Sequence, residues 1–231
     1  MLPTPDNENR SLISRPGRLL EKAESGVKRV LAEMVADVLG LAPVEDAELL
    51  FQTGASYHRK QDYGEAVKYL RKAAQANHAR AQYILGLCCH EGTGTPSDNV
   101  EAVTWFTRAA TQGHADGQHS LGFCYASGLG VRQDHAQSVG WYRKAAEQGN
   151  AQAQNNLAKC YQNGCGVPQN YDEAVKWFLE AARQGNTESQ YGLAYCYIHG
   201  QGVTQSYVWR QPSGTERQLN RDTNVLERPW R

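Results

Sequence analysis

Hydrophobic positions in the middle of the chain recur at steps of three and four residues, with polar positions between them. Ala81, Leu85 and Cys88 follow this spacing, which places them on one face of a helix. After a glycine-rich connection, Trp105 and Ala109 lie on a second face of the same kind. This stretch therefore predicts a pair of amphipathic helices that bury their apolar faces against each other.

The same helix pair is copied along the chain with a spacing of 36 residues. Equivalent positions form columns, which contain Trp105, Trp141 and Trp177; Leu85, Leu121, Leu157 and Leu193; and Cys88, Cys124, Cys160 and Cys196. Self-similarity at this period is typical of a solenoid, in which each unit packs only against its neighbours. The predicted fold class is therefore all-α, a right-handed α-solenoid of helix-turn-helix repeats with a period of about 36 residues.

Polar caps and glycines set the predicted helix boundaries. An N-cap that accepts hydrogen bonds from the first backbone N–H groups is expected before each second helix, at Asp98, Asp134 and Asn170. Glycine in a left-handed conformation is expected where that helix ends, at Gly113, Gly149 and Gly185. Small residues at Gly86 and Gly122 permit close helix approach. The opposing stripe of the second helix is expected to bring a large ring into the space that they leave, and it contains Ala102, Trp105, Phe106, Ala109 and Ala110.

Three stretches carry a resemblance to a known repeat family: LGLCCHEGTGTPSDNVEAVTWFTRAATQGH, LGFCYASGLGVRQDHAQSVGWYRKAAEQGN and LAKCYQNGCGVPQNYDEAVKWFLEAARQGN. Their Leu-Gly or Leu-Ala start, G-x-G connection, aromatic pair and closing Ala-Ala and Gln-Gly are similar to Sel-1-like repeats. The first unit has a shorter connection, and its YHRKQDYGEAVKYLRKAA run resembles a tetratricopeptide repeat. With that unit and an incomplete last one, the resemblance covers residues 46–203.

The resemblance implies an array in which the first helix of each unit lines a concave surface. The expected organisation is a disordered leader at 1–17, an amphipathic capping helix at 18–40, a tetratricopeptide-like first repeat at 46–80, Sel-1-like repeats at 81–116, 117–152 and 153–188, an incomplete fourth repeat at 189–207, and a disordered tail at 208–231. The fourth unit begins with the expected pattern and loses it near Val208.

Charge and hydropathy narrow the classes of partner and compartment. The 24 basic and 24 acidic side chains cancel, so the sequence predicts no broad field for nucleic acid. No apolar run approaches the length of an integral membrane segment. Arg10, Arg15 and Arg18 suggest an organellar presequence, but Asp6 and Glu8 argue against it, so the predicted compartment is cytoplasmic.

The six cysteines are predicted to be free thiols. Equivalent positions in stacked helices should lie about 8 to 10 Å apart, and a disulfide does not span Cα atoms more than about 7 Å apart. Cys89 and Cys165 fall in other columns without a recurring partner. This usage fits a reducing compartment.

Several short motifs were weighed as chemistry, and none supports an enzyme, a metal or a cofactor. Ser25 to Lys28 and Ser97 to Asn99 match two beta-lactamase signatures, but the third, K-T-G, is absent and that fold is incompatible with this array. Cys88 and Cys89 point about 100° apart on a helix and cannot share a tetrahedral ion. The G-x-G connections follow helices, whereas a dinucleotide loop follows a strand.

The columns that do not repeat are the candidate binding residues, because the packing columns are fixed by the fold. The protein-binding residues predicted on the first-helix face are Tyr83, Leu87, His90, His119, Phe123, Asn155, Lys159, Gln162, Tyr191 and Tyr195. Tyr83, Phe123, Tyr191 and Tyr195 would provide aromatic anchors, and Asn155 and Lys159 would add polar specificity. The alternative is a solvated face whose residues have no binding role.

Three functions were considered. The first is a non-enzymatic adaptor or scaffold that holds a protein or peptide client in the concave groove, as Sel-1-like proteins commonly do in signalling and assembly. The second is a regulatory or tethering module of an enzyme complex, such as a kinase or membrane synthase. The third, a secreted cysteine-rich protein, requires two cysteines per unit and a signal peptide, which this sequence lacks. The incomplete last repeat also suggests self-association.

Overall fold

The computed structural model describes residues 46–203. The described helices are α2 (Ala47–Arg59), α3 (Tyr63–Gln75), α4 (Ala79–Glu91), α5 (Asn99–Thr111), α6 (Ala115–Ser127), α7 (His135–Glu147), α8 (Ala151–Asn163), α9 (Tyr171–Arg183) and α10 (Thr187–His199). No strand occurs within this range, which confirms the all-α prediction. The predicted leader (1–17), capping helix (18–40) and tail (208–231) lie outside the described residues.

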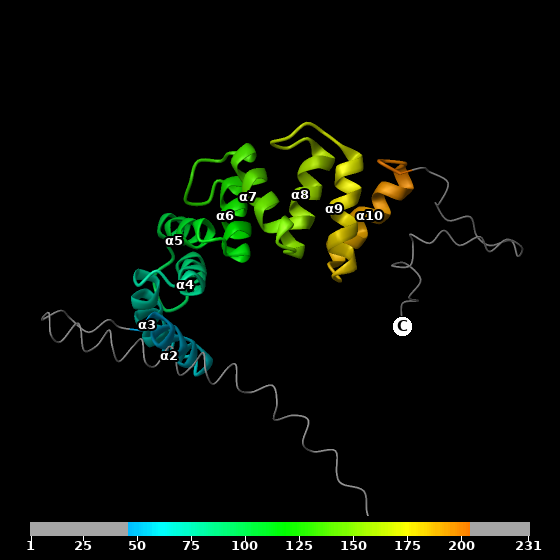
Figure 1. Ribbon diagram of the computed structural model, residues 1–231. Coiled ribbons are helices and arrows are strands. Elements are labelled where there is room, and N and C mark those ends of the chain that lie inside the picture. Colours follow the sequence, from blue (N-terminus) through cyan, green and yellow to red (C-terminus); the bar gives the residue numbers. More distant parts are fainter. Residues whose placement is uncertain (1–45, 204–231) are drawn as a thin grey trace, which may run out of the picture. The chain divides into compact units, whose positions relative to one another are not determined.

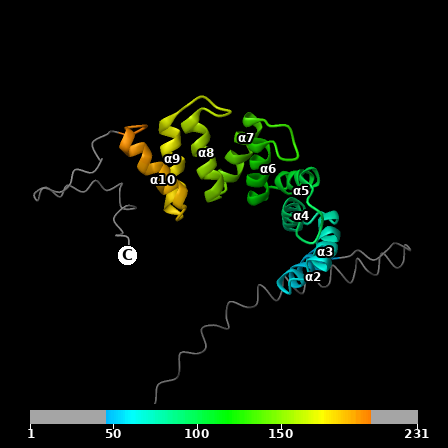
Figure 2. The same cartoon turned by 180° about the vertical axis from the view of Figure 1, so that it is seen from behind.

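Each helix packs chiefly against its neighbours in the chain. The pairs α2/α3, α4/α5, α6/α7 and α8/α9 form the repeats, and α10 begins a further unit (Figure 1). Seen from behind in Figure 2, the same helices still follow one another in chain order. Contacts of this sequential kind are expected of a helical solenoid, in which each unit is buried only by the next.

The predicted caps of the second helices are confirmed. Asp98 accepts hydrogen bonds from the backbone N–H groups of Val100 and Glu101 at 2.9 and 3.0 Å. Asp134 and Asn170 cap α7 and α9, and each accepts one hydrogen bond, from the backbone N–H of Gln137 and of Glu173. The predicted glycines after these helices have the expected positive φ, at Gly113, Gly149 and Gly185.

The caps of the first helices were not predicted, although they also form a column. They are His78, His114, Asn150 and Asn186, spaced by 36 residues. The Nδ1 atom of His114 accepts a hydrogen bond from the backbone N–H of Gly117 at 3.2 Å, and Asn150 makes the equivalent bond to Ala153 at 2.8 Å. Histidine is not among the preferred cap residues, but Asn150 and Asn186 in the same column are, and they are the signal that could have predicted it.

Within the predicted stripe, the ring that fills the space left by the small residues is that of the aromatic residue after the tryptophan. A Cβ atom at Gly86 would lie 2.6 Å from the Phe106 ring, and one at Gly122 would lie 2.7 Å from the Tyr142 ring. Successive helical residues point about 100° apart, so the preceding tryptophan faces another direction, in which Trp105 is still buried. Trp141 is only half-buried, with the Lys144 ammonium 4.1 Å from its ring centroid.

Buried glutamines connect consecutive helices through a hydrogen-bond ladder. In α4, the Gln82 side chain donates to the Ala74 carbonyl in α3 at 3.0 Å and accepts from Gln112, which follows α5, at 2.6 Å. The same pair of bonds recurs at Gln118 and at Gln154. Each of these side chains is 5% exposed or less, so its polar atoms need such partners inside the protein. The ladder fixes the relation of one repeat to the next.

The second glycine of each G-x-G connection allows two repeats to approach closely. At Gly130 φ is +69°, and an added Cβ atom would lie 2.0 Å from the carbonyl oxygen of Asn99 at the start of α5. A side chain at this position is therefore excluded both by the backbone conformation and by the preceding repeat. The role predicted for these glycines as backbone positions is confirmed.

All six cysteines are free thiols, and four of them are buried. Burial raises the pKa of Cys124 and of Cys160 to about 11, and raises the pKa of Cys89 to about 12. Thiols with raised pKa values are poor nucleophiles at neutral pH, because the thiolate is the reactive form. The column therefore serves packing, as predicted.

Candidate protein-binding face

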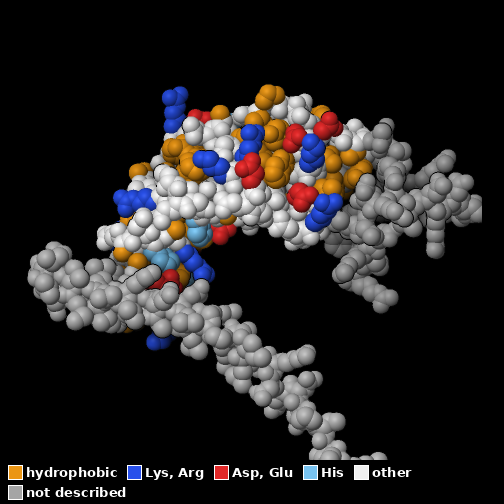
Figure 3. All heavy atoms as spheres, in the orientation of Figure 1, with side chains coloured by type: hydrophobic (Ala, Val, Ile, Leu, Met, Phe, Trp, Pro, Cys, Tyr) orange, Lys and Arg blue, Asp and Glu red, His pale blue; other side chains and the backbone are white. Residues whose placement is uncertain are grey.

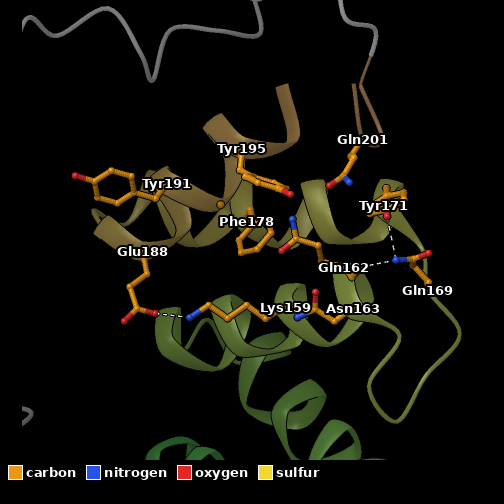
Figure 4. A pocket seen from close by; sticks show the side chains of 11 residues that line it. Lys159, Gln162, Asn163, Gln169, Tyr171, Phe178, Glu188, Tyr191, Tyr195 and Gln201 are labelled. Carbon is orange, nitrogen blue, oxygen red and sulfur yellow. Dashed lines mark hydrogen bonds and ion pairs between the residues drawn. The ribbon is translucent and has the colours of Figure 1, made fainter. Parts of the chain in front are cut away.

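Within residues 46–203, the face formed by the first helices is hollowed at two places that have equivalent linings. The larger, of about 650 Å³, lies between α8, α9 and α10, and is called here the α8–α10 hollow. The smaller, of about 100 Å³, lies between α4, α5 and α6 and is called the α4–α6 hollow. The larger is shown in Figure 4.

The two hollows bring together eight of the ten predicted binding residues. Leu87, His90, His119 and Phe123 line the α4–α6 hollow, and Lys159, Gln162, Tyr191 and Tyr195 line the α8–α10 hollow. Three of the predicted aromatic anchors are exposed, namely Phe123 (42%), Tyr191 (72%) and Tyr195 (49%). Tyrosine is one of the residue types enriched at the hot spots of protein interfaces, so Tyr191 and Tyr195 are candidate anchors.

Asn155 does not present its side chain on this face, in contrast to the prediction. It is 3% exposed, and its amide nitrogen donates to the Glu188 carboxylate at 2.9 Å while its amide oxygen accepts from the Ser189 hydroxyl at 2.9 Å. Helix α10 covers this position. Asn155 therefore holds two repeats together, and the polar character expected of it is used inside the array.

Tyr83 also differs from the expected exposed anchor. It is half-buried, and its ring stacks on the His114 ring with 5.0 Å between centroids. It also packs against Phe106, and burial raises the pKa of its hydroxyl. Tyr83 lines neither hollow. Its ring packs instead on His114, the N-cap residue of α6.

The α8–α10 hollow has an aromatic floor and walls. Figure 4 shows Phe178 between the two walls, with Tyr191 and Tyr195 on α10 and Lys159 on α8 opposite. Phe178 is 1% exposed, so its ring is a fixed surface. The Lys159 ammonium lies 2.6 Å from the Glu188 carboxylate, and this hydrogen bond lowers the pKa of Glu188, with a smaller contribution from Asn155. The charges that line the hollow are therefore paired.

Carboxamide side chains form its remaining edge. The amide nitrogen of Gln169 donates to the Gln162 carbonyl at 2.8 Å and to the Tyr171 hydroxyl at 3.0 Å (Figure 4). Among the described residues, the side-chain oxygen of Gln201 is buried without a hydrogen-bond partner. An unpaired buried acceptor costs about 1–3 kcal/mol, so a donor from a bound molecule would be favourable there.

The α4–α6 hollow is smaller and more apolar. Phe106 is its buried floor, and Leu87 and Phe123 are its apolar sides. His90 is held by Asn99, with 2.7 Å between its Nδ1 atom and the amide oxygen. His119 accepts a hydrogen bond at Nε2 from the Asn156 amide at 3.1 Å, and burial lowers the pKa of its imidazole. The neutral form of His119 is therefore the one that this contact requires.

Sequence reasoning missed the residues that come from second helices and loops. Phe106 and Phe178 form the floors, and Gln169, Tyr171 and Gln201 belong to the connections and to the start of α9. The prediction considered only first-helix columns. The signal that could have found the floors is the aromatic column after the tryptophans, which the repeat alignment already contained.

Neither metal chemistry nor a membrane span is indicated between residues 46 and 203. No group of three or more His, Cys, Asp or Glu side chains in this range is arranged to hold an ion. None of the helices described combines the length and the apolar content needed to cross a membrane. On the side seen in Figure 3, apolar side chains are mixed with charged side chains of both signs.

Sequentially packed helix pairs define an α-solenoid built from helical repeats. A family model for the Sel1 repeat matches residues 41–78, 79–114, 115–150, 151–186 and 187–208, which includes the first, shorter unit. The chain belongs to the Sel1 repeat family. Such repeats generally mediate protein–protein interaction and are typically non-catalytic.

Solved structures with the same fold support this membership. One is c5321, a protective antigen present in uropathogenic Escherichia coli strains, with 35% identity and a TM-score of 0.68 over 82% of this chain. Another is a Sel1 repeat protein from Oxalobacter formigenes, with 29% identity and a TM-score of 0.64 over 81% of this chain. The matches span 37% of the first protein and 76% of the second.

A more limited similarity links the chain to a mammalian protein. DAP3-binding cell death enhancer 1 of Rattus norvegicus is 35% identical over 68 residues, and the Mus musculus protein matches equally. These residues are 29% of this chain and 13% of each relative. The chain therefore matches only a small part of these curated relatives.

Proposed function

We propose that this chain is a non-enzymatic scaffold that holds an exposed segment of a client protein on its first-helix face. The observation that carries the proposal is that both hollows open on this one face, each beside exposed aromatic residues. The name of the mammalian relative records binding to a protein, which supports a client of the same class.

Support for the compartment comes from the cysteines. The six thiols are free, and Cys88, Cys89, Cys124 and Cys196 are buried as packing residues. A reducing compartment such as the cytoplasm suits this usage. Exposed Tyr191 and Ile198 on α10 support self-association, which sedimentation of the full chain against Tyr191→Ser at several concentrations would test.

The central test replaces one residue in each of three first helices. Phe123, Lys159 and Tyr195 are changed together to alanine, and proteins retained by the immobilised full chain are identified by mass spectrometry. A matched control changes three residues that do not line the hollows to alanine: the aromatic Tyr63, the aliphatic Val100 and the ion-paired Lys176. We expect clients to be retained by the wild type and the control but lost from the triple variant.

Both variants should keep the helical circular dichroism of the wild type, because the changed side chains are exposed. Clients retained equally by the triple variant would contradict the proposal. Retention of the subunits of one enzyme, whose activity the chain then alters, would instead favour the regulatory-module hypothesis.

A further inference from the structure

The two hollows occupy the same position in the repeat, two repeats apart. Six residues that line the smaller hollow have counterparts 72 residues later that line the larger one. The equivalent pairs include the floors Phe106 and Phe178 and the exposed rims Phe123 and Tyr195. Equivalent positions of the repeat therefore form both hollows, although most of the side chains at these positions differ.

One column of the first helices distinguishes open positions from closed ones. It contains Ile84, Ser120, Asn156 and Gly192. Ser120 and Gly192 line the two hollows, and a Cβ atom at Gly192 would lie 2.6 Å from the Phe178 ring. The larger side chain of Asn156 instead reaches His119 at 3.1 Å and occupies the intervening position. A small residue in this column adds little side-chain volume above the floor of the hollow.

The position between the hollows is closed for a second reason. Asn155 is equivalent to His119 and Tyr191, but it is 3% exposed, whereas Tyr191 is 72% exposed. Its amide is already bonded to Glu188 and Ser189. The face therefore alternates, with an open site, a closed site and an open site from α4 to α10.

The chemistry of the lining indicates what enters. In the larger hollow, Lys159 is paired with Glu188. The lining of the smaller hollow contains no lysine, arginine, aspartate or glutamate. The floors are aromatic, which suits uncharged apolar side chains. Carboxamides such as Gln201 both donate and accept, as peptide groups do, and the buried oxygen of Gln201 lacks a donor within the described part of the chain.

The geometry also sets a spacing. Helices α8 and α10 contact each other directly through Asn155 and Ser189, so successive first helices lie about 10 Å apart. Equivalent points two repeats apart are then separated by about 20 Å, which about six residues of extended chain would span.

We propose that the face binds one extended peptide segment with two uncharged apolar anchors about six residues apart, one in each hollow. The inference rests on the proposed function and adds the chemistry and the register of the client. The larger hollow takes an aromatic anchor and the smaller one an aliphatic anchor, in keeping with volumes of about 650 and 100 Å³. The residue in the column of Ser120 and Gly192 is the specificity determinant.

A phage-displayed library of random peptides of about 16 residues, long enough to span both hollows, is the probe. It is selected on the full chain and counter-selected on the Phe123, Lys159 and Tyr195 triple variant. We expect enriched peptides to carry two apolar residues at the stated spacing. Replacing either anchor with alanine in a synthetic peptide should weaken binding at least about tenfold, because the two contacts act as linked sites.

The protein variants place asparagine, the residue found at position 156, at the equivalent positions of the two hollows. Ser120→Asn and Gly192→Asn should each close one hollow and reduce affinity to that of a single-anchor peptide, while Asn156→Ser should retain tight binding. Circular dichroism monitors folding, and Tyr195→Ala replaces Gly192→Asn if the latter unfolds.

Each outcome separates the two proposals. Peptides that bind through one anchor, or whose affinity Ser120→Asn leaves unchanged, overturn the two-anchor inference but keep the proposed function if the triple variant fails to bind them. Enrichment of charged peptides overturns the assigned chemistry. Equal enrichment on the wild type and the triple variant overturns both.

Discussion

The two central first helices, α6 and α8, are alike where they pack into the array and different where they face outward. Leu121 and Leu157 are both buried, and Gln118 and Gln154 make the same ladder bonds. On the open face, Phe123 of α6 is replaced in α8 by an equivalent lysine. The array therefore keeps its packing side constant while its binding side is free to change.

The caps of these helices differ in a way that affects their response to pH. His114 begins α6 and Asn150 begins α8, and each accepts one hydrogen bond from a backbone N–H group. Only the histidine titrates near neutral pH. Two helices with the same packing can thus differ in how their stability depends on pH, because their cap residues differ.

The largest expected effect tests the aromatic layer between α6 and α8. Tyr142 is 3% exposed, and burial raises its pKa to about 12, whereas its neighbour Trp141 is half-buried. Tyr142→Ala should lower the free energy of unfolding by about 3–5 kcal/mol, and Trp141→Ala by no more than about 2 kcal/mol. Urea denaturation measures both, and a greater loss at Trp141 would restore the tryptophan as the core ring.

The second prediction concerns the leucines that the two helices share. Leu121→Ala and Leu157→Ala should each cost about 2–5 kcal/mol, and the two values should be close because both sites are equally buried. The measurement is again urea denaturation, with Lys159→Ala as a surface control of small effect. Widely different costs would show that the packing sides of α6 and α8 are not equivalent.

The glutamine ladder gives a smaller effect. Gln118→Ala leaves the Ala110 carbonyl and the Gln148 amide without their buried partner, and Gln154→Ala does the same one repeat later. Each change should lower stability by about 1–3 kcal/mol. Thermal unfolding followed by circular dichroism provides the measurement. A neutral result at both positions would mean that water replaces the ladder bonds without loss.

The smallest effect separates the two caps. Burial lowers the pKa of His114 below 6.5, Asp116 opposes this shift, and Arg80 and His78 add to it. Above pH 6.5 the imidazole is neutral in both states and the cap is intact. As the pH falls from 6.5 towards the lowered folded pKa, the unfolded state binds more protons, so stability decreases and then levels off.

His114→Asn gives α6 the same cap residue as α8 and should reduce the dependence of the free energy of unfolding on pH. The part of this dependence that comes from His119, whose pKa is also lowered by burial, should remain. The free energy of unfolding is measured between pH 7 and pH 5 for both proteins, a window around the ordinary pKa of histidine. An unchanged slope would assign the pH dependence to other groups.

Much of the fold followed from the repeat columns, because buried positions recur where the same neighbour recurs. The caps at Asp98, Asp134 and Asn170 and the left-handed glycines were predicted from local chemistry and are confirmed. The core prediction for the Trp column is confirmed at Trp105, which is buried, but Trp141 and Trp177 are only half-buried. Adjacent helical residues face different directions, and the column spacing does not say which one faces the partner helix.

The candidate site was predicted less completely. First-helix columns found Phe123 and Tyr195, but they could not show that Asn155 is covered by α10 or that Gln201 reaches the same hollow as Lys159. These facts depend on how neighbouring repeats approach each other, which involves residues more than 30 positions apart.

The amino-acid sequence by itself determined the helix pairs, their period and their ends, because spacing, caps and glycines act within a few residues. Only the tertiary structure decided which aromatic ring is buried, which polar side chains are used inside the array, and where the face is open. The physical reason is that accessibility depends on the packed neighbours: Gly192 lines a hollow only because the neighbouring repeat brings Phe178 against it.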